Sequence, residues 1–363
     1  MSRVVTFGEI MGRLAPGGFL RFRQAMPGSL DFTFAGAEAT VAASIAHLGG
    51  DAAFVTALPD HAIGDACIAN LRAIGVETRH ILRTKSGRLG LYFLETGANQ
   101  RAGNVIYDRE GAAVAITPAE HYPWPAIFDR AEWFHISGIT PAISKVASQA
   151  ALAAARHASA HGAKVSCDLN FRRKLWNWEP GTSPRDLSER TMRQILPHVD
   201  VVIGNEEDAA EVLGIHARDT NVQEGKLAID QYPDVARQIV KQFPNVSKVG
   251  ITLRESISAS HNNFGAMLYD AGEDRVCYAP TNHGHYQPYA ITHIVDRVGG
   301  GDAFAAGLIF ALTTAELSAL QTAVAFATAA SCLAHSIQGD FNFCSRSEIE
   351  ALVSGSGSGR VVR

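Results

Sequence analysis

The sequence predicts an α/β fold with a largely parallel sheet, and two observations carry that prediction. Short apolar runs typical of buried strands alternate with helical patterns over most of the chain, as in sheets whose strands are connected through helices. Between positions 296 and 307, three consecutive glycines are followed by an aspartate and an alanine-rich helical pattern. Ligands of such folds gather at the carboxyl ends of the strands, so this glycine run is the first candidate for a site.

The elements are expected in a regular order. Strands are expected at 4–7, 53–57, 133–137, 164–168, 200–203 and 248–252. Helices are expected between them, at 37–48, 63–74, 143–161, 206–213 and 234–243. Two long helical patterns, 303–312 and 317–335, follow the glycine run.

Two segments, 11–34 and 89–114, interrupt this alternation with strand-like patterns and no helix between them. Runs 89–94 and 104–107 flank a glycine-containing turn and indicate a hairpin. We therefore expect one domain over 1–353 with a small β-sheet lid, from segments of about 11–35 and 88–115, inserted in the α/β core. Such a lid would exclude water from a reaction. The Gly/Ser-rich tail, 354–363, is expected to be flexible.

The composition is that of an ordinary globular enzyme. Hydrophobic residues make up 47% of the 363 positions and charged residues 19%. The net charge of -4 and the absence of a Lys/Arg block argue against nucleic-acid and membrane-surface partners. The sequence suggests neither a signal peptide nor a membrane span, and the five cysteines lie far apart. A cytoplasmic protein without disulfides is expected.

The glycine run has the chemistry of an anion site. Glycine permits φ > 0 and a close approach of a ligand, and a helix start offers free N–H donors and a partial positive charge. Asp302 follows directly. A carboxylate would repel phosphate, but it suits a base that accepts the proton of an attacking hydroxyl. From these residues alone, helix capping by Asp302 explains the pattern equally well.

Other classes of site find no support. There is no G-x-x-x-x-G-K-[ST] phosphate loop and no G-x-S-x-G nucleophile turn. The glycine run lacks the third glycine of a dinucleotide fingerprint and lies near the C-terminal end. His283, His285 and His293 have no carboxylate or cysteine at ligand spacing, so a polar loop explains them better than a metal site.

Several segments together resemble one family. Residues 296–307, D-R-V-G-G-G-D-A-F-A-A-G, resemble the D-T-x-G-A-G-D-x-F signature of the ribokinase-like (PfkB) carbohydrate kinases. Residues 34–42 resemble that family's G-G-x-x-x-N-x-A sugar-binding segment, and 205–208 resemble its N-x-x-E element. The segments occur in the family's order over about the whole chain. The resemblance implies a three-layer α/β/α core and transfer of the γ-phosphoryl group of ATP to a sugar hydroxyl.

Within the family the chain is most similar to the kinases that convert 2-keto-3-deoxygluconate to its 6-phosphate. The similarity lies in segments 8–14, 36–39, 89–92, 106–109 and 168–172. It implies a sugar-acid substrate whose carboxylate Arg109 and Arg172 would bind, since guanidinium suits bidentate carboxylate binding. Tyr92 and Tyr107 would close over the sugar. Without the resemblance, surface arginines and half-buried strand aromatics are the simpler explanation.

The resemblance assigns further roles. Asp302 would be the catalytic base, and the anion hole would be formed by Gly299, Gly300 and Gly301. The helix N-terminus should keep Asp302 ionised and therefore a weak base, which a loose phosphoryl-transfer transition state tolerates. The sugar-binding segment contributes Gly36, Ala37 and Glu38.

The resemblance also implies ATP and Mg²⁺ as cofactors and leaves a monovalent cation open. The residues that match nucleotide-binding positions are Asn170, Asn205, Thr252, Arg254 and Ser256. Asp208 would hold Mg²⁺ indirectly, through water, since this ion keeps several of its waters. A capped helix start explains the Asn205 segment equally well without the resemblance.

The chain departs from the family pattern at several positions. Thr40 stands where asparagine is typical, so one sugar contact is not assured. Asp208 replaces glutamate and is one methylene shorter, and residues 253–255 replace a more glycine-rich nucleotide loop. Gly300 replaces alanine and Ala35 replaces glycine.

Two alternatives stay open on the sequence. The first is a kinase for fructose, ribose or 5-keto-2-deoxygluconate, although a neutral sugar would leave Arg109 and Arg172 unpaired. The second is a catalytically silent sugar- or nucleotide-binding regulator, which Thr40 and the altered nucleotide loop favour and Asp302 argues against. The edges of the inserted sheet need covering, so a homodimer through paired lids is expected.

Overall fold

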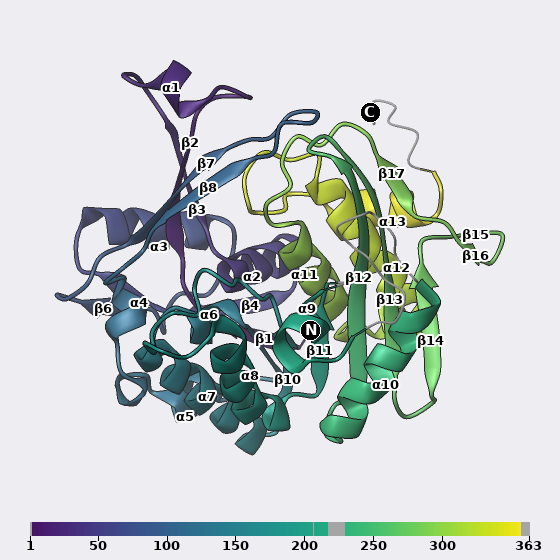
Figure 1. Cartoon of the computed structure of the whole chain (residues 1–363). Coiled ribbons are helices and arrows are strands. Elements are labelled where there is room, and N and C mark those ends of the chain that lie inside the picture. Colours follow the sequence, from purple (N-terminus) through teal and green to yellow (C-terminus); the bar gives the residue numbers. More distant parts are fainter. Residues whose placement is uncertain (1, 206, 217–228, 357–363) are drawn as a thin grey trace.

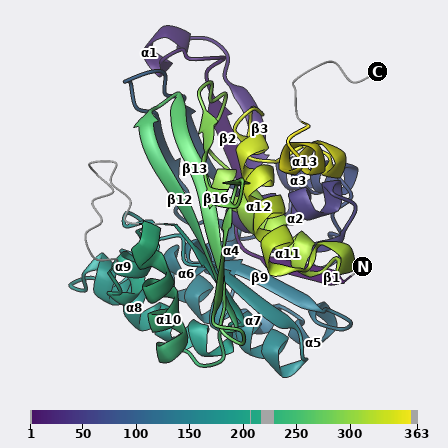
Figure 2. The same cartoon turned by 90° about the vertical axis from the view of Figure 1, so that its right-hand side faces the viewer.

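The computed structural model describes residues 2–205, 207–216 and 229–356, and a nine-stranded sheet forms its centre (Figure 1, Figure 2). The strand order is β14-β13-β12-β11-β10-β9-β1-β4, and β17 also pairs with β13. All neighbours from β4 to β12 are parallel. The strands are β1 (Arg3–Phe7), β4 (Asp51–Val55), β9 (Trp133–Ser137), β10 (Lys164–Asp168), β11 (Val201–Gly204), β12 (Lys248–Ser258), β13 (His261–Asp270), β14 (Arg275–Ala279) and β17 (Tyr289–Ile291).

Helices cover both faces of this sheet, which confirms the expected three-layer α/β/α core with a mainly parallel sheet (Figure 2). Successive residues of β1 pack into the hydrophobic cores on opposite faces of the sheet: Val4 belongs to one core and Val5 to the other. One layer contains α2 (Ala37–His47), α3 (Ala62–Ala73), α11 (Gly300–Leu312), α12 (Leu320–Ala334) and α13 (Arg346–Val353). The other contains α4 (Ala113–Ile116), α5 (Trp124–Ile127), α6 (Ile139–Ala142), α7 (Lys145–Ala160), α8 (Pro184–Ile195), α9 (Asp208–Leu213) and α10 (Tyr232–Gln242).

A second sheet of four strands, the accessory sheet, rises above the core in Figure 1. Its order is β3-β2-β7-β8, with bounds β2 (Met11–Ala15), β3 (Asp31–Ala35), β7 (Gly90–Glu95) and β8 (Asn104–Asp108). A short helix, α1 (Phe22–Ala25), lies at the tip between β2 and β3. Two further pairs are β5 (Ala57–Pro59) with β6 (Leu82–Thr84) and β15 (Thr281–Asn282) with β16 (His285–Tyr286).

The two faces of the accessory sheet differ in chemistry because side chains alternate along each strand. One row across the sheet, in register, is Thr33, Arg13, Tyr92 and Tyr107. The next row is Phe32, Leu14, Phe93 and Ile106, and it is apolar throughout. Phe32 and Ile106 are 46% and 49% exposed, so the apolar face is open to solvent in a single chain.

The structure differs from the sequence-based expectations in a few places. The run 53–57 is divided between β4 and β5. The run 248–252 continues to Ser258 and pairs antiparallel with β13, so that side of the sheet is mixed. Helix α8 is an addition: Ser183 caps it by accepting a hydrogen bond from the Asp186 N–H, but its composition is strongly polar. Position 206, in an expected helix, and 357–363, in the expected tail, lie outside the described residues.

None of the described helices combines the length and the hydropathy that are needed to cross a bilayer.

Candidate active site

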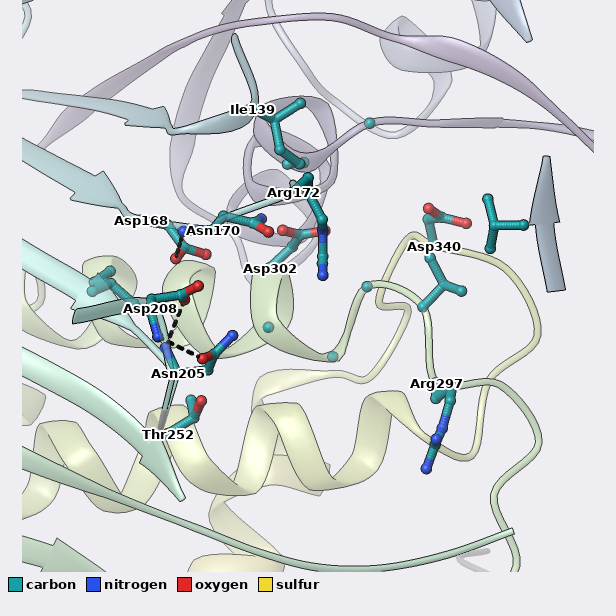
Figure 3. A pocket seen from close by; sticks show the side chains of 18 of the residues that line it. Ile139, Asp168, Asn170, Arg172, Asn205, Asp208, Thr252, Arg297, Asp302 and Asp340 are labelled. Atoms are coloured by element: carbon teal, nitrogen blue, oxygen red, sulfur yellow. Dashed lines mark hydrogen bonds between the residues drawn. The ribbon is translucent and has the colours of Figure 1, made fainter. Parts of the chain in front are cut away.

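A pocket of about 370 Å³ lies at the carboxyl ends of the central strands, beneath the accessory sheet. Its wall combines residues from loops that follow β1, β10 and β11, from β7, β8 and β12, and from the starts of α2 and α11 (Figure 3). Most of the residues expected from the sequence line this pocket: Gly36, Ala37, Tyr92, Tyr107, Arg109, Asn170, Arg172, Asn205, Asp208, Thr252, Arg254, Gly299, Gly300, Gly301 and Asp302.

Two expected residues do not line the pocket. Glu38 lies behind its wall, 1% exposed, where its carboxylate accepts hydrogen bonds from the hydroxyls of Ser137 and Thr140 at 2.7 and 2.8 Å. Burial raises the pKa of Glu38. Ser256 is exposed on β12, two positions beyond Arg254. Direct contact with a ligand in this pocket is therefore not expected for Glu38 or Ser256.

The glycine turn has its shape because other parts of the chain approach it closely. Gly299 has φ of 85°, in the left-handed region, and a Cβ there would lie 2.3 Å from the Asp340 carbonyl oxygen. At Gly300 a Cβ would lie 2.8 Å from Cε1 of His335. The alanine of the PfkB signature would therefore force the His335 ring of this chain to shift. Gly301 faces open space, and the first N–H groups of α11 have no partner within the helix.

Asp302 lies in the first turn of α11, is half-buried and lines the pocket. Burial, followed by the charges of Asp340 and Glu38, raises the pKa of its carboxyl to about 7, and Arg172 opposes that rise. The expectation that the helix N-terminus would keep Asp302 a weak base is wrong. Desolvation and neighbouring carboxylates favour the protonated form, so Asp302 is a stronger base than an ordinary aspartate.

Two more carboxylates, Asp168 and Asp208, line the pocket to the left of Asp302 in Figure 3. Asp208 is held by backbone N–H groups, those of Asn205 and Phe171, each at 2.9 Å. In turn, the Asn205 side-chain oxygen accepts a hydrogen bond from the Asp208 N–H at 3.0 Å. Burial raises the pKa of both carboxyls, and the charge of Asp208 raises that of Asp168 further.

The pocket's arginines differ in their partners. Arg109, directly after β8, forms an ion pair with Glu9, which is 3% exposed. The Arg109 guanidinium carbon lies 5.4 Å from the centre of the Tyr107 ring. Arg297 donates to the Asn262 side-chain oxygen at 2.7 Å. Arg172 is exposed, and within the described part of the chain no hydrogen bond or ion pair engages its guanidinium. It stands next to Asp302 in Figure 3 and lowers the pKa of that carboxyl.

Sequence reasoning missed several residues of the pocket. Glu9, Asp168, Arg297, His335 and Asp340 all line it. Asp168 could have been found, because it ends an expected strand where ligands of α/β folds bind. Asn170, two residues on, has φ of 33°, a rare conformation that is found at functional sites. His335 and Asp340 follow α12 with no local pattern that marks them.

Comparison with known proteins identifies the family. The pfkB family carbohydrate kinase model matches residues 1–345. The 2-dehydro-3-deoxygalactonokinase of Haloferax volcanii is 31% identical over 361 residues, which cover 99% of this chain and 98% of that protein. The solved structure of 2-dehydro-3-deoxygluconokinase from Thermotoga maritima is 41% identical with a TM-score of 0.86, and the match covers 98% of this chain and 100% of that one.

A third similar structure supports the same assignment. A putative 2-keto-3-deoxygluconate kinase from Enterococcus faecalis is 27% identical with a TM-score of 0.85, and the match covers 100% of this chain and 99% of that one. The family model spans nearly the whole length, and two relatives above 30% identity are matched end to end. The chain is a carbohydrate kinase of the PfkB family.

Proposed function

We propose that this kinase phosphorylates a 2-keto-3-deoxy sugar acid, most simply 2-keto-3-deoxygluconate, on its 6-hydroxyl. The observation that carries the proposal is that Asp302 and Arg172, a base and an arginine that no ion pair engages in the described part of the chain, line the same pocket. The substrate class is supported by the names of the relatives that are 41% and 31% identical over almost the whole chain.

In this proposal the glycine turn and Asp302 act on the two reacting groups. The N–H groups of residues 299–301 stabilise charge that develops on the transferred phosphoryl oxygens. Asp302 accepts the proton of the sugar hydroxyl as that oxygen attacks phosphorus. A pKa of about 7 gives Asp302 useful basicity while leaving it substantially ionised near neutral pH.

The substrate carboxylate is assigned chiefly to Arg172. Glu9 already offsets the charge of Arg109, so that pair presents little net charge to a ligand. The Arg172 guanidinium, which no hydrogen bond or ion pair engages within the described part of the chain, can bind a carboxylate with charge-assisted hydrogen bonds. Tyr92 and Tyr107 provide the aromatic wall on the accessory sheet, whose segments we propose act as a lid.

ATP and Mg²⁺ are assigned to the end of the pocket that is formed by the loops after β10 and β11 and by β12. Asn170, Asn205, Thr252 and Arg254 line it there and would contact the nucleotide. Asp168 and Asp208 fit Mg²⁺ because both carboxyls are buried and the charge of Asp208 acts on Asp168, so a bound cation would relieve that repulsion. Mg²⁺ would keep several of its waters there, since it binds proteins through one or two carboxylates together with substrate phosphates. When bound, Mg²⁺ would neutralise charge on the ATP phosphates.

The experiment is a phosphorylation assay over a panel of sugars. The panel contains 2-keto-3-deoxygluconate, its galacto epimer, 5-keto-2-deoxygluconate, fructose and ribose. The galacto epimer is the second candidate, because the Haloferax volcanii relative is named for it. We expect kcat/KM for the 2-keto-3-deoxy acids to exceed that for fructose and ribose by at least about 10²-fold. Equal values for neutral sugars would refute the acid assignment.

A pair of neighbouring variants tests the role of Arg172. Arg172→Met should raise KM for the acid by roughly 10- to 100-fold, since a hydrogen bond to a charged group contributes about 1.5–3 kcal/mol. Arg173→Met is the matched control, because Arg173 is 66% exposed, pairs with Glu211 and does not line the pocket. An unchanged KM in Arg172→Met would contradict the assignment of the carboxylate to this residue.

We also propose that the enzyme works as a homodimer in the cytoplasm, where ATP is supplied. The apolar row that includes Phe32 and Ile106 would be covered by the same row of a second chain. Light scattering should give a dimer for the wild type and a monomer for Phe32→Asp with Ile106→Asp. A monomeric wild type at micromolar concentration would refute this part of the proposal.

A further inference from the structure

A buried ion cluster joins the accessory sheet to the glycine turn. Arg13 on β2 is 3% exposed and lies between two carboxylates, pairing with Asp296 and, at 2.7 Å, with Asp340. Tyr92, the residue opposite Arg13 on β7, donates a hydrogen bond of 2.7 Å to the same Asp340 oxygen. Arg13 does not line the pocket, so its effect on a ligand there must pass through other residues.

Asp296 and Asp340 both contact the backbone around Gly299, the first through its carboxylate and the second through its carbonyl. Asp296 accepts hydrogen bonds from the N–H groups of Val298 at 3.1 Å and Gly339 at 3.2 Å. The Asp340 carbonyl occupies the space that a side chain at Gly299 would need. Within the described residues, Arg13 makes every ion pair that reaches these two carboxylates.

We infer that Arg13 is a positioning residue for phosphoryl transfer, whose guanidinium holds the loops of Asp296 and Asp340 together and so fixes the glycine turn. The inference rests on the proposed roles of that turn and of Asp302. Two buried carboxylates repel each other and have lost their water, so they need a cation between them. A planar guanidinium can bond each through a separate N–H group, which an ammonium does with poorer geometry.

Because Arg13 belongs to the accessory sheet, the turn is organised only when that sheet sits on the core. The charge on Asp302 depends on the groups around it. The charged groups near Asp302 are Glu38, Asp168, Arg172 and Asp340, and the His335 ring lies beside Gly300. Arg13 opposes the rise that burial causes in the pKa of Asp340, so removing Arg13 changes the charge beside Asp302 and with it the pKa of the Asp302 carboxyl.

The test compares Arg13→Met, Arg13→Lys and Arg21→Met. Arg21→Met is the matched control, because Arg21 is another arginine at the accessory sheet that pairs with a carboxylate, Glu95 at 3.1 Å, away from the turn. Each variant is checked for folding by circular dichroism and thermal unfolding. Its kcat and KM are then measured with any sugar that the wild type accepts, so failure of the sugar-acid assignment leaves this test intact.

We expect kcat of Arg13→Met to fall on the order of 10²-fold with little change in the sugar KM, because misplacing a reacting group by about 1 Å has that effect. Arg13→Lys should keep an intermediate kcat, and Arg21→Met should match the wild type. The pH at which kcat/KM is half-maximal should differ between Arg13→Met and the wild type. A folded Arg13→Met variant with wild-type kcat and pH profile would overturn the inference. If Arg13→Met does not fold, wild-type kcat in Arg13→Lys would overturn it.

Chemical rescue separates positioning by charge from simple packing. In Arg13→Gly, guanidinium chloride at a non-denaturing concentration should restore part of the lost kcat, while potassium chloride at equal ionic strength should not. Absence of any rescue in a folded Arg13→Gly variant would count against a role for the guanidinium itself.

Discussion

The contact between Gly300 and His335 allows a sharp test of how this glycine turn is built. An alanine Cβ at position 300 would lie 2.8 Å from Cε1 of His335, whereas ordinary contacts begin at 3.4 Å. The ring cannot move aside freely, because it is 4% exposed and its Nδ1 lies 2.7 Å from the Ser331 carbonyl oxygen. Overpacking of this kind costs about 1–3 kcal/mol, so we expect Gly300→Ala to be destabilised by about 2 kcal/mol.

The expected change in Tm follows from the length of the chain. Unfolding entropy is about 2.1 cal/mol/K per residue, or about 0.76 kcal/mol/K for 363 residues. A loss of about 2 kcal/mol therefore lowers Tm by about 3 °C. Gly301→Ala is the matched control on the same helical turn, because its Cβ would meet open space. Its Tm should be unchanged or slightly higher, since alanine is favoured over glycine in helices by up to about 1 kcal/mol.

Differential scanning calorimetry on a double-mutant cycle measures the contact itself. Gly300→Ala should lower Tm in the wild-type background and have little effect once His335→Ala has removed the ring. The reasoning fails if Gly300→Ala lowers Tm equally in both backgrounds, or if Gly301→Ala is as destabilising as Gly300→Ala.

The remaining predictions concern Asp302. Asp302→Asn should reduce kcat by about 10²–10⁴-fold while ATP binding by calorimetry persists, and near-normal turnover would disprove the base. In the wild type, kcat/KM should rise with pH through a midpoint near the pKa of about 7 and then level off, because the base must be ionised; a profile without that rise would contradict it. The folded carboxyl holds its proton up to about pH 7 and an unfolded one only to about pH 4, so stability falls as pH rises through that window. Asp302→Asn should therefore raise Tm more at about pH 8 than at about pH 4, and an equal change at both would argue against the raised pKa.

The parts of the fold with a local signal were predictable from the sequence. The strands at 133–137 and 164–168 agree residue for residue with β9 and β10, because an apolar run bounded by polar residues marks a strand buried on both faces. The hairpin of β7 and β8 followed from alternation around a glycine turn. Helix α8 was missed because its hydrophobic stripe is carried by few residues, although Ser183 and Pro184 mark its start.

The pocket was predictable only where a motif or a strand end marks it. Resemblance to the PfkB kinases predicted the glycine turn and the lid residues. It predicted neither the raised pKa of Asp302 nor the ion pair between Arg109 and Glu9. Both depend on burial and on partners, Asp340 and Glu9, that lie far from them in the chain. The reason for Gly300 likewise became clear only from the place of His335.

The ion pair between Arg13 and Asp340 joins residues 327 positions apart, and this has a consequence for the newly made chain. A ribosome adds roughly 5–20 residues per second, so Arg13 is synthesised about 16 to 65 s before Asp340. During that interval the accessory sheet can form its hairpin, but the glycine turn that it braces does not yet exist. Activity therefore requires that segments near the two ends of the chain have come into contact. A nascent or C-terminally truncated chain that lacks Asp340 should be inactive even where most of its core has folded.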